Sequence, residues 1–252
     1  MPFHRAILVT ILALGFFCAA TPKSRCQTFE VKGVKIRYAV EGKGEPVVLI
    51  HGLYSSGFIN WKLTGVVAEL AKTHQVILLD LPGHGFSSKP TNKEAYGVQM
   101  VDDVVLLLDH LKIKKAHIVG YSLGGMITMK LLVKHPDRVL SATVAGMGWF
   151  KEGTLWQKLM EKLPAGGLGP PAAFFEVVGT LALTEQELKK IDAPVKVLVG
   201  DRDIVKALYV ESLQKVRKEW PVVEIKDADH LSCVIRQSFR EEIAAWVRKN
   251  TK

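Results

Sequence analysis

A serine, an aspartate and a histidine occur in this order along the chain, in local settings that suit nucleophilic catalysis. Ser122 is the centre of a Gly-x-Ser-x-Gly sequence at residues 120–124, between an apolar run and a helix-like run. Asp203 follows another apolar run, and His230 lies in a late loop. A serine hydroxyl attacks efficiently only when a base takes its proton, and the base needs a third group to orient it. These residue types therefore predict acyl transfer through Ser122.

The sequence around Ser122 is typical of a nucleophile elbow, in which a strand turns sharply into a helix. Such a turn leaves little room for neighbouring side chains, which explains the glycines at 120 and 124. It also places the hydroxyl beside a helix N-terminus, where backbone N–H groups favour negative charge. The alternative is an ordinary strand-to-helix turn capped by serine.

The predicted partners of Ser122 lie in the last quarter of the chain. Two acids, Asp201 and Asp203, follow the apolar run at 195–200, and either could cap the loop while the other orients a base. His230 is the candidate base because the other histidines occur earlier, although a loop histidine could also simply cap the next element. In open α/β sheets the chemistry lies at the carboxyl ends of the strands. We therefore expect these groups to meet at one edge of a sheet.

Apolar runs typical of strands alternate with amphipathic stretches typical of helices along most of the chain, which predicts one α/β domain over residues 21–252. Strands are expected at 28–31, 35–41, 47–50, 75–80, 116–119, 139–145, 195–200 and 222–225. Helices are expected at 61–72, 99–111, 125–135, 205–219 and 238–249. Residues 146–192 break the alternation and predict a small helical cap, with helix-like pieces at 154–163, 172–180 and 184–191.

Apolar side chains are frequent in the predicted cap. They are Trp149, Phe150, Leu155, Trp156, Leu159, Met160, Phe174, Phe175 and Leu181. They could line a pocket for an acyl chain or a ring, but packing of the cap onto the core explains most of them better. The cap contains no cluster of acids or arginines that would suit a charged substrate. The sequence therefore favours a small or medium apolar ester.

Several motifs occur together in a fixed order. They are His51-Gly52, the Asp80-x-x-Gly83-x-Gly85-x-Ser87 run, the elbow, Gly200-x-x-Asp203 and Asp229-His230. With them the chain resembles the α/β-hydrolase fold family, in its serine esterase-like branch, over roughly residues 29–247. The resemblance implies a mostly parallel eight-stranded sheet flanked by helices, with a helical cap insertion.

The same resemblance implies roles for individual residues. It implies a catalytic triad of Ser122, Asp203 and His230, and it favours Asp203 over Asp201 through the spacing from Gly200. It also implies an oxyanion hole formed by the backbone N–H groups of Leu53 and Leu123. One departure is that the family often has a proline a few residues after the acid, where this chain continues Ile-Val-Lys. His51 and the Asp80 run are expected to be structural.

The predicted reaction is hydrolysis of a carboxylic ester through an acyl-enzyme, with no cofactor and no metal. Hydrolysis of a C–C bond, a lactone or a thioester on the same triad is an alternative, as is a non-catalytic protein that binds a small ligand on this scaffold. Epoxide-hydrolase and dehalogenase chemistry is disfavoured because those relatives carry an aspartate at the position of Ser122.

The first 20 residues differ from the rest. A short basic start precedes the uncharged apolar run 6–20, which predicts a secretory signal peptide at 1–20 and an exported protein. The alternative is a retained membrane anchor at 6–20, which would be the only expected membrane contact. After removal of the signal, Cys26 and Cys233 remain and could pair, although two cysteines are no disulfide framework.

Composition and the distribution of charge argue against nucleic-acid binding. The formal net charge is +9 and 48% of the residues are hydrophobic, which suits a globular domain with a sizeable core. The lysines are scattered, and nucleic-acid binding would need a clustered basic stripe on a recognisable module. We therefore expect a small ester-like substrate and no nucleic acid; the sequence carries no signal for an oligomeric state.

Overall fold

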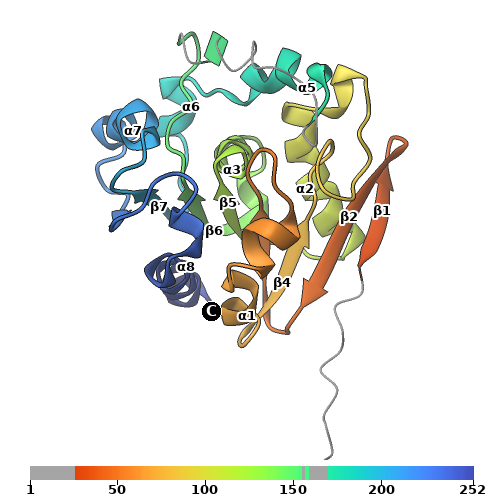
Figure 1. Ribbon diagram of the computed structural model, residues 1–252, viewed down its shortest axis with the longest axis horizontal. Coiled ribbons are helices and arrows are strands. Elements are labelled where there is room, and N and C mark those ends of the chain that lie inside the picture. Colours follow the sequence, from red (N-terminus) through yellow and green to blue (C-terminus); the bar gives the residue numbers. More distant parts are fainter. Residues whose placement is uncertain (1–25, 155–156, 159–169) are drawn as a thin grey trace, which may run out of the picture.

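The computed structural model describes residues 26–154, 157–158 and 170–252, and it shows one mixed sheet flanked by helices (Figure 1). The strand order is β1-β2-β4-β3-β5-β6-β7-β8. The strands are β1 (Gln27–Val31), β2 (Val34–Glu41), β3 (Glu45–Ile50), β4 (His74–Leu79), β5 (Ala116–Tyr121), β6 (Val139–Ala145), β7 (Val195–Gly200) and β8 (Val222–Ile225). The pairs β1–β2 and β2–β4 are antiparallel and the other pairs are parallel. The predicted fold class and all eight predicted strands are confirmed.

The helices cover both faces of this sheet. They are α1 (Val66–Leu70), α2 (Val98–His110), α3 (Leu123–Lys134), α5 (Ala172–Val177), α6 (Glu185–Lys189), α7 (Glu211–Val216) and α8 (Gln237–Asn250). Short 3₁₀ or π segments are η1 (Phe58–Lys62), η2 (Lys93–Ala95), η3 (Pro136–Arg138), η4 (Val178–Leu181), η5 (Lys206–Val210) and η6 (Cys233–Ile235).

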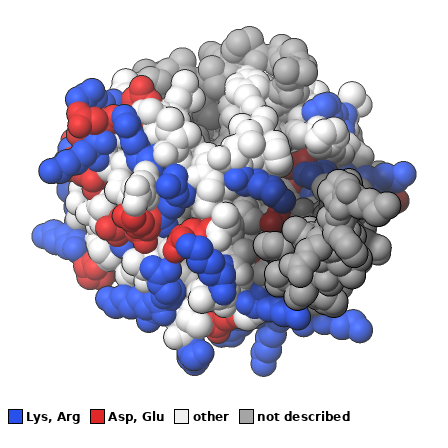
Figure 2. Space-filling view, turned by 60° about the horizontal axis from the view of Figure 1, so that its bottom comes forward, with Lys and Arg blue, Asp and Glu red and all other residues white. Residues whose placement is uncertain are grey.

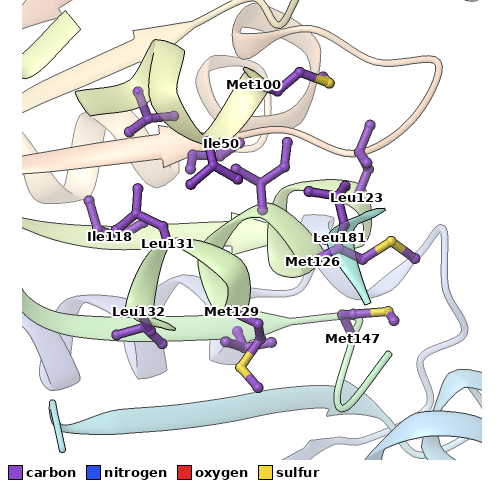
Figure 3. Packing of buried hydrophobic residues seen from close by; sticks show 14 of the residues in the cluster. Ile50, Met100, Ile118, Leu123, Met126, Met129, Leu131, Leu132, Met147 and Leu181 are labelled. Carbon is purple, nitrogen blue, oxygen red and sulfur yellow. The ribbon is translucent and has the colours of Figure 1, made fainter. Parts of the chain in front are cut away.

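The central strands are apolar throughout because both of their faces are buried. Successive side chains of a strand point to opposite faces, so Val48 and Ile50 of β3 join one apolar cluster while Val47 and Leu49 join the other. The first cluster packs under α2 and α3, and Figure 3 shows part of it around α3. The second packs under α1 and α8. The core therefore consists of two layers separated by the sheet.

Two predicted helices differ from the structure. The stretch predicted as one helix at 61–72 is instead η1 followed by α1, because Gly65 between them has a left-handed φ of 81°. The helix predicted at 205–219 consists of η5 and α7 and ends at Val216. There Arg217 leaves the helical conformation, and its guanidinium donates to the carbonyl oxygens of Leu188 and Ile191.

The predicted cap region, between β6 and β7, contains α5, η4 and α6, which lie at the top of Figure 1. The described apolar residues of the prediction are all buried, which confirms their packing role; they are Trp149, Phe150, Phe174, Phe175 and Leu181. Most of the piece predicted at 154–163 lies outside the described residues, as do Leu155, Trp156, Leu159 and Met160. The ammonium of Lys130 on α3 holds the cap by donating to the Ala182 carbonyl and the Glu187 carboxylate.

The last strand, β8, is short and lies at an edge of the sheet. It has four residues, pairs only with β7, and buries Ile225 while its other three side chains are partly or fully exposed. The turn that follows it leads to His230, and α8 then returns the chain across the second apolar cluster. The loop with the predicted catalytic His230 therefore follows a strand that has little packing of its own.

The predicted signal peptide at 1–20 lies outside the described residues. Within the part of the chain that the structure describes, no helix has the length and apolar character needed to cross a membrane. Cys26 is exposed and Cys233 is buried, and both are free thiols, so the pairing left open by the sequence is not formed. Lys and Arg side chains on the face in Figure 2 are interspersed with acidic and uncharged residues.

Candidate active site

The nucleophile candidate, Ser122, lies at the junction of β5 and α3. Its backbone has φ 53° and ψ −111°, a conformation that a non-glycine residue rarely adopts. Its N–H donates to the Ala145 carbonyl at 2.8 Å, and its own carbonyl accepts from the N–H of Met126 at 3.1 Å. The elbow is thus anchored to β6 on one side and to the first turn of α3 on the other.

The glycines of the elbow are required by close backbone contacts. A Cβ on Gly120 would lie 2.1 Å from the Gly124 carbonyl oxygen, and a Cβ on Gly124 would lie 2.0 Å from the carbonyl oxygen of Ile50. These distances are far below van der Waals contact, and both neighbours are backbone atoms that cannot turn away. Glycine at these positions therefore allows α3 to start directly against the end of β3.

The structure brings Ser122, His230 and Asp203 together in one chain of hydrogen bonds. The distance from Ser122 Oγ to His230 Nε2 is 3.0 Å, and that from His230 Nδ1 to Asp203 Oδ2 is 2.8 Å. A carboxylate only accepts, so the imidazole carries its proton on Nδ1 and leaves the Nε2 lone pair facing the hydroxyl. This is the tautomer that a general base requires.

Asp203 is held at the end of β7 by its own loop. It is buried, and its Oδ1 accepts the Val205 N–H at 2.9 Å, which leaves Oδ2 for the imidazole. Asp201 has a different role, because its carboxylate accepts the N–H groups of Asp227 and Ala228, both at 3.0 Å. These bonds lower the pKa of Asp201 and cap the turn that leads to His230. The geometry therefore places Asp203, the acid that the resemblance favours, against His230 and gives Asp201 a role in the loop.

Tyr121, which the sequence analysis did not single out, holds His230 in place. Its hydroxyl donates to the backbone carbonyl of His230, and its ring lies against the imidazole with centroids 5.4 Å apart. Burial raises the pKa of Tyr121, so the hydroxyl stays protonated and remains a donor. The Asp229 carboxylate supports the same loop by accepting the N–H groups of Leu231 and Ser232.

The two predicted oxyanion donors flank the serine. Leu123 is the first residue of α3, and Leu53 follows Gly52 after β3. A Cβ on Gly52 would lie 3.3 Å from Ser122 Cβ, which shows how closely this loop approaches the nucleophile. Within the described residues, neither leucine N–H donates a hydrogen bond. Both donors are therefore available to a charge that develops beside Ser122.

The loop that carries Leu53 is fixed by two buried polar side chains. Asn60, which the sequence analysis missed, accepts the Gly52 N–H through Oδ1 at 3.0 Å. His51 accepts the Leu81 N–H at Nε2, so its Nδ1 carries the proton and donates to the Gly52 carbonyl at 2.7 Å. Burial lowers the pKa of His51 and keeps it neutral. Its predicted structural role is confirmed.

The Asp80 run is structural, as predicted. The Asp80 carboxylate is buried and accepts the N–H groups of Gly57 and Phe86, both at 2.9 Å, and pairs with the guanidinium of Arg37 at 3.2 Å. A Cβ on Gly85 would lie 2.3 Å from this carboxylate, which explains the glycine. These bonds tie the loop after β4 to the segment that precedes η1.

A cavity of about 360 Å³ opens at the serine. It is lined by Gly52, Leu53, Tyr54, Ser55, Ile59, Asn60, Tyr121, Ser122, His230, Leu231 and Val234. These residues come from the loop after β3 and η1, from the elbow, and from the loop after β8 and η6; none comes from the described part of the cap. No cluster of three or more potential metal ligands occurs among residues 26–154, 157–158 and 170–252.

Comparison with known proteins places this fold in a family. A family model of the alpha/beta hydrolase fold matches residues 45–214, and the chain belongs to this family. The described triad geometry includes His230, which lies beyond the matched range.

Individual relatives align with about half of this chain. It is 40% identical over 125 residues to the dihydrolipoyllysine-residue acetyltransferase component of the acetoin cleaving system of Cupriavidus necator, which is 49% of this chain and 32% of that protein. It is 36% identical over 116 residues to a 2-hydroxymuconate semialdehyde hydrolase of a Pseudomonas species, which is 45% of this chain and 40% of that one. The chain thus matches well under half of the length of these curated relatives.

Solved structures match over most of the chain. An N-acyl homoserine lactone degrading enzyme is 26% identical with a TM-score of 0.68, covering 88% of this chain and 99% of that one. A meta-cleavage product hydrolase from Pseudomonas fluorescens IP01 has a TM-score of 0.70 at 20% identity, covering 88% and 97%. The second likeness shows the fold alone.

Proposed function

We propose that this protein is a serine hydrolase that cleaves carboxylic esters with a small to medium apolar part. The observation that carries the proposal is the hydrogen-bond chain from Ser122 through His230 to the buried carboxylate of Asp203. Family membership supports hydrolytic chemistry in general, and the geometry at Ser122 supports this particular mechanism.

In the proposed reaction, Ser122 Oγ attacks the ester carbonyl while His230 Nε2 takes the hydroxyl proton. The carbonyl oxygen becomes an oxyanion, which the N–H groups of Leu53 and Leu123 stabilise; one such donor contributes about 2.7–4 kcal/mol. The tetrahedral intermediate collapses as the imidazolium passes its proton to the leaving alcohol, and an acyl-serine remains. Water activated by His230 then attacks this ester, which releases the acid and restores Ser122.

The cavity supports the substrate class. Its volume of about 360 Å³ is near the lower end of the range of roughly 300–1,000 Å³ that is usual for small-molecule sites. Apart from the reacting groups, Leu53, Ile59, Leu231 and Val234 give it an apolar lining. A lactone is the second candidate, because the lactone-degrading enzyme is similar over nearly the whole described fold.

The direct test compares the wild-type chain with Ser122→Ala. We expect the wild type to release p-nitrophenol from short acyl esters and to react at Ser122 with a fluorophosphonate probe. The alanine variant should lose about 10⁶-fold in kcat and all labelling. Lactones and thioesters in the same assay identify the preferred bond. Equal turnover in the two proteins would refute the mechanism, and a wild type that neither labels nor turns over would indicate a binding protein.

A further inference from the structure

Exposed apolar side chains are gathered around the mouth of the Ser122 cavity. Nine large apolar side chains are exposed in the described part of the chain, and six of them lie in two short segments. The six, which we call the apolar rim, are Tyr54, Phe58, Ile59, Leu63, Leu231 and Ile235. Single exposed apolar residues are normal, whereas a contiguous group marks an interaction surface.

The two segments of the apolar rim adjoin one another in space. Tyr54 and Ile59 of the first segment and Leu231 of the second all line the cavity. Further out, the Arg240 guanidinium donates to the carbonyl oxygens of Thr64 and Ile235, which joins the end of the first segment to the end of the second. The two segments are therefore joined both at the cavity wall and further out, at Arg240.

The two segments of the rim carry basic side chains, and the acids Glu41 and Asp229 lie next to them. Residues 54–65 and 231–240 contain three basic residues, Lys62, Arg236 and Arg240, and no acidic residue. The Lys62 ammonium pairs with Glu41, and the guanidinium groups of Arg236 and Arg240 donate to backbone carbonyls. The Asp229 carboxylate lies close enough to Arg236 for their charges to interact, whereas Arg240 has no acidic partner among the ion pairs of the described residues. Apolar side chains bordered by cationic ones suit a surface that is anionic outside and apolar beneath.

We propose that the apolar rim docks onto an anionic lipid bilayer. Leu63, Leu231 and Ile235, which are 67%, 83% and 62% exposed, enter the acyl region, and the flanking arginines meet lipid phosphates. The cavity mouth then faces the lipid, and an apolar ester passes from the bilayer to Ser122 without crossing water. The delivery of substrate rests on the proposed function, but the binding of the bilayer does not require turnover.

The test measures binding of the Ser122→Ala chain to vesicles of phosphatidylcholine alone or with an equal part of phosphatidylglycerol. We expect this chain to bind the mixed vesicles more tightly than vesicles of phosphatidylcholine alone. Adding Leu63→Ser and Ile235→Ser, which lie outside the cavity lining, weakens this binding at least about tenfold. The matched control changes two exposed apolar residues away from the rim, Phe86→Ser and Leu106→Ser, and leaves binding unchanged.

Hydrogen exchange of the same chain locates the contact. Mixed vesicles should slow amide exchange in residues 53–63 and 230–236 and leave the segment around Phe86 unaffected. Protection confined to residues 1–25, or equal binding by the rim and control variants, would overturn the proposal. So would a rim variant that only converts a dimer to a monomer in sedimentation, which would assign the rim to a second copy of the chain.

The two proposals fail in different ways. Vesicle binding that depends on the rim, in a wild-type chain without esterase activity, would leave the docking surface standing and refute the proposed function. Rapid hydrolysis of soluble esters by a chain that shows no rim-dependent binding would support the proposed function and refute the docking surface.

Discussion

Replacing Asp203 by asparagine would invert the hydrogen bond that orients His230. Oδ1 of Asp203 accepts the Val205 N–H at 2.9 Å, so the asparagine amide places its oxygen there and its NH₂ group toward the imidazole. His230 Nδ1 must then accept, which moves the imidazole proton to Nε2, opposite Ser122. The base can no longer take the serine proton. In a triad of this kind the wrong tautomer lowers kcat by about 10⁴, or about 5.5 kcal/mol.

The matched control is Asp201→Asn, because Asp201 is two residues away and serves the loop rather than the imidazole. We expect it to lower kcat less than about tenfold, since the amide oxygen still accepts one of the two N–H groups. Steady-state kinetics on a p-nitrophenyl ester and thermal melts of both variants provide the comparison. Asp203→Asn retaining a tenth of the wild-type kcat, or Asp201→Asn losing as much as Asp203→Asn, would refute the assignment.

Two further predictions concern groups that the proposed chemistry does not use directly. Tyr121→Phe leaves the His230 carbonyl without its hydrogen-bond donor, and we expect about tenfold lower kcat with about 1–3 kcal/mol lower stability. The control is Tyr96→Phe, which removes the donor to the Pro90 carbonyl and should lower stability but not kcat. Burial raises the pKa of Asp103 to about 6, so unfolding free energy should fall by up to about 3 kcal/mol as pH rises from 4 to 7. Asp103→Asn should remove this fall in denaturant titrations; an unchanged pH profile would contradict the reasoning.

The sign of the Asp103 effect follows from proton binding. Between the unfolded pKa of 3.8 and the folded value of about 6, the folded state binds more protons than the unfolded state. Stability therefore decreases with pH across this range, and the full stabilisation is present only below it.

The parts of the site that the sequence predicted are those whose physical cause is local. Gly120 and Gly124 are specified by clashes within the elbow and against β3, and the apolar runs of β5 and β7 follow from burial on both faces. Such causes leave a pattern in neighbouring residues. The strands, the elbow and the order of the candidate residues were therefore accessible before the structure.

The parts that the sequence did not predict depend on distant or backbone partners. Tyr121 donates to a carbonyl 109 positions away, and Asn60 accepts a backbone N–H, so neither bond requires a particular residue type in its partner. The resemblance favoured Asp203 as the acid, but the role of Asp201 in capping the turn before His230 required the spatial course of the loop. The break at Gly65 was missed because the apolar spacing continues across it while the backbone turns left-handed.

The position of β8 has a consequence for how the protein loses its catalytic geometry. His230 follows the shortest strand, at the sheet edge, whereas Ser122 follows β5, which is paired on both sides. Segments with few buried contacts open at a lower free energy than the whole domain. Fraying of this edge would separate the base from the nucleophile while the elbow and the two apolar layers stay intact. Loss of the base and loss of the fold are therefore distinct events, and an intact core does not guarantee a competent site.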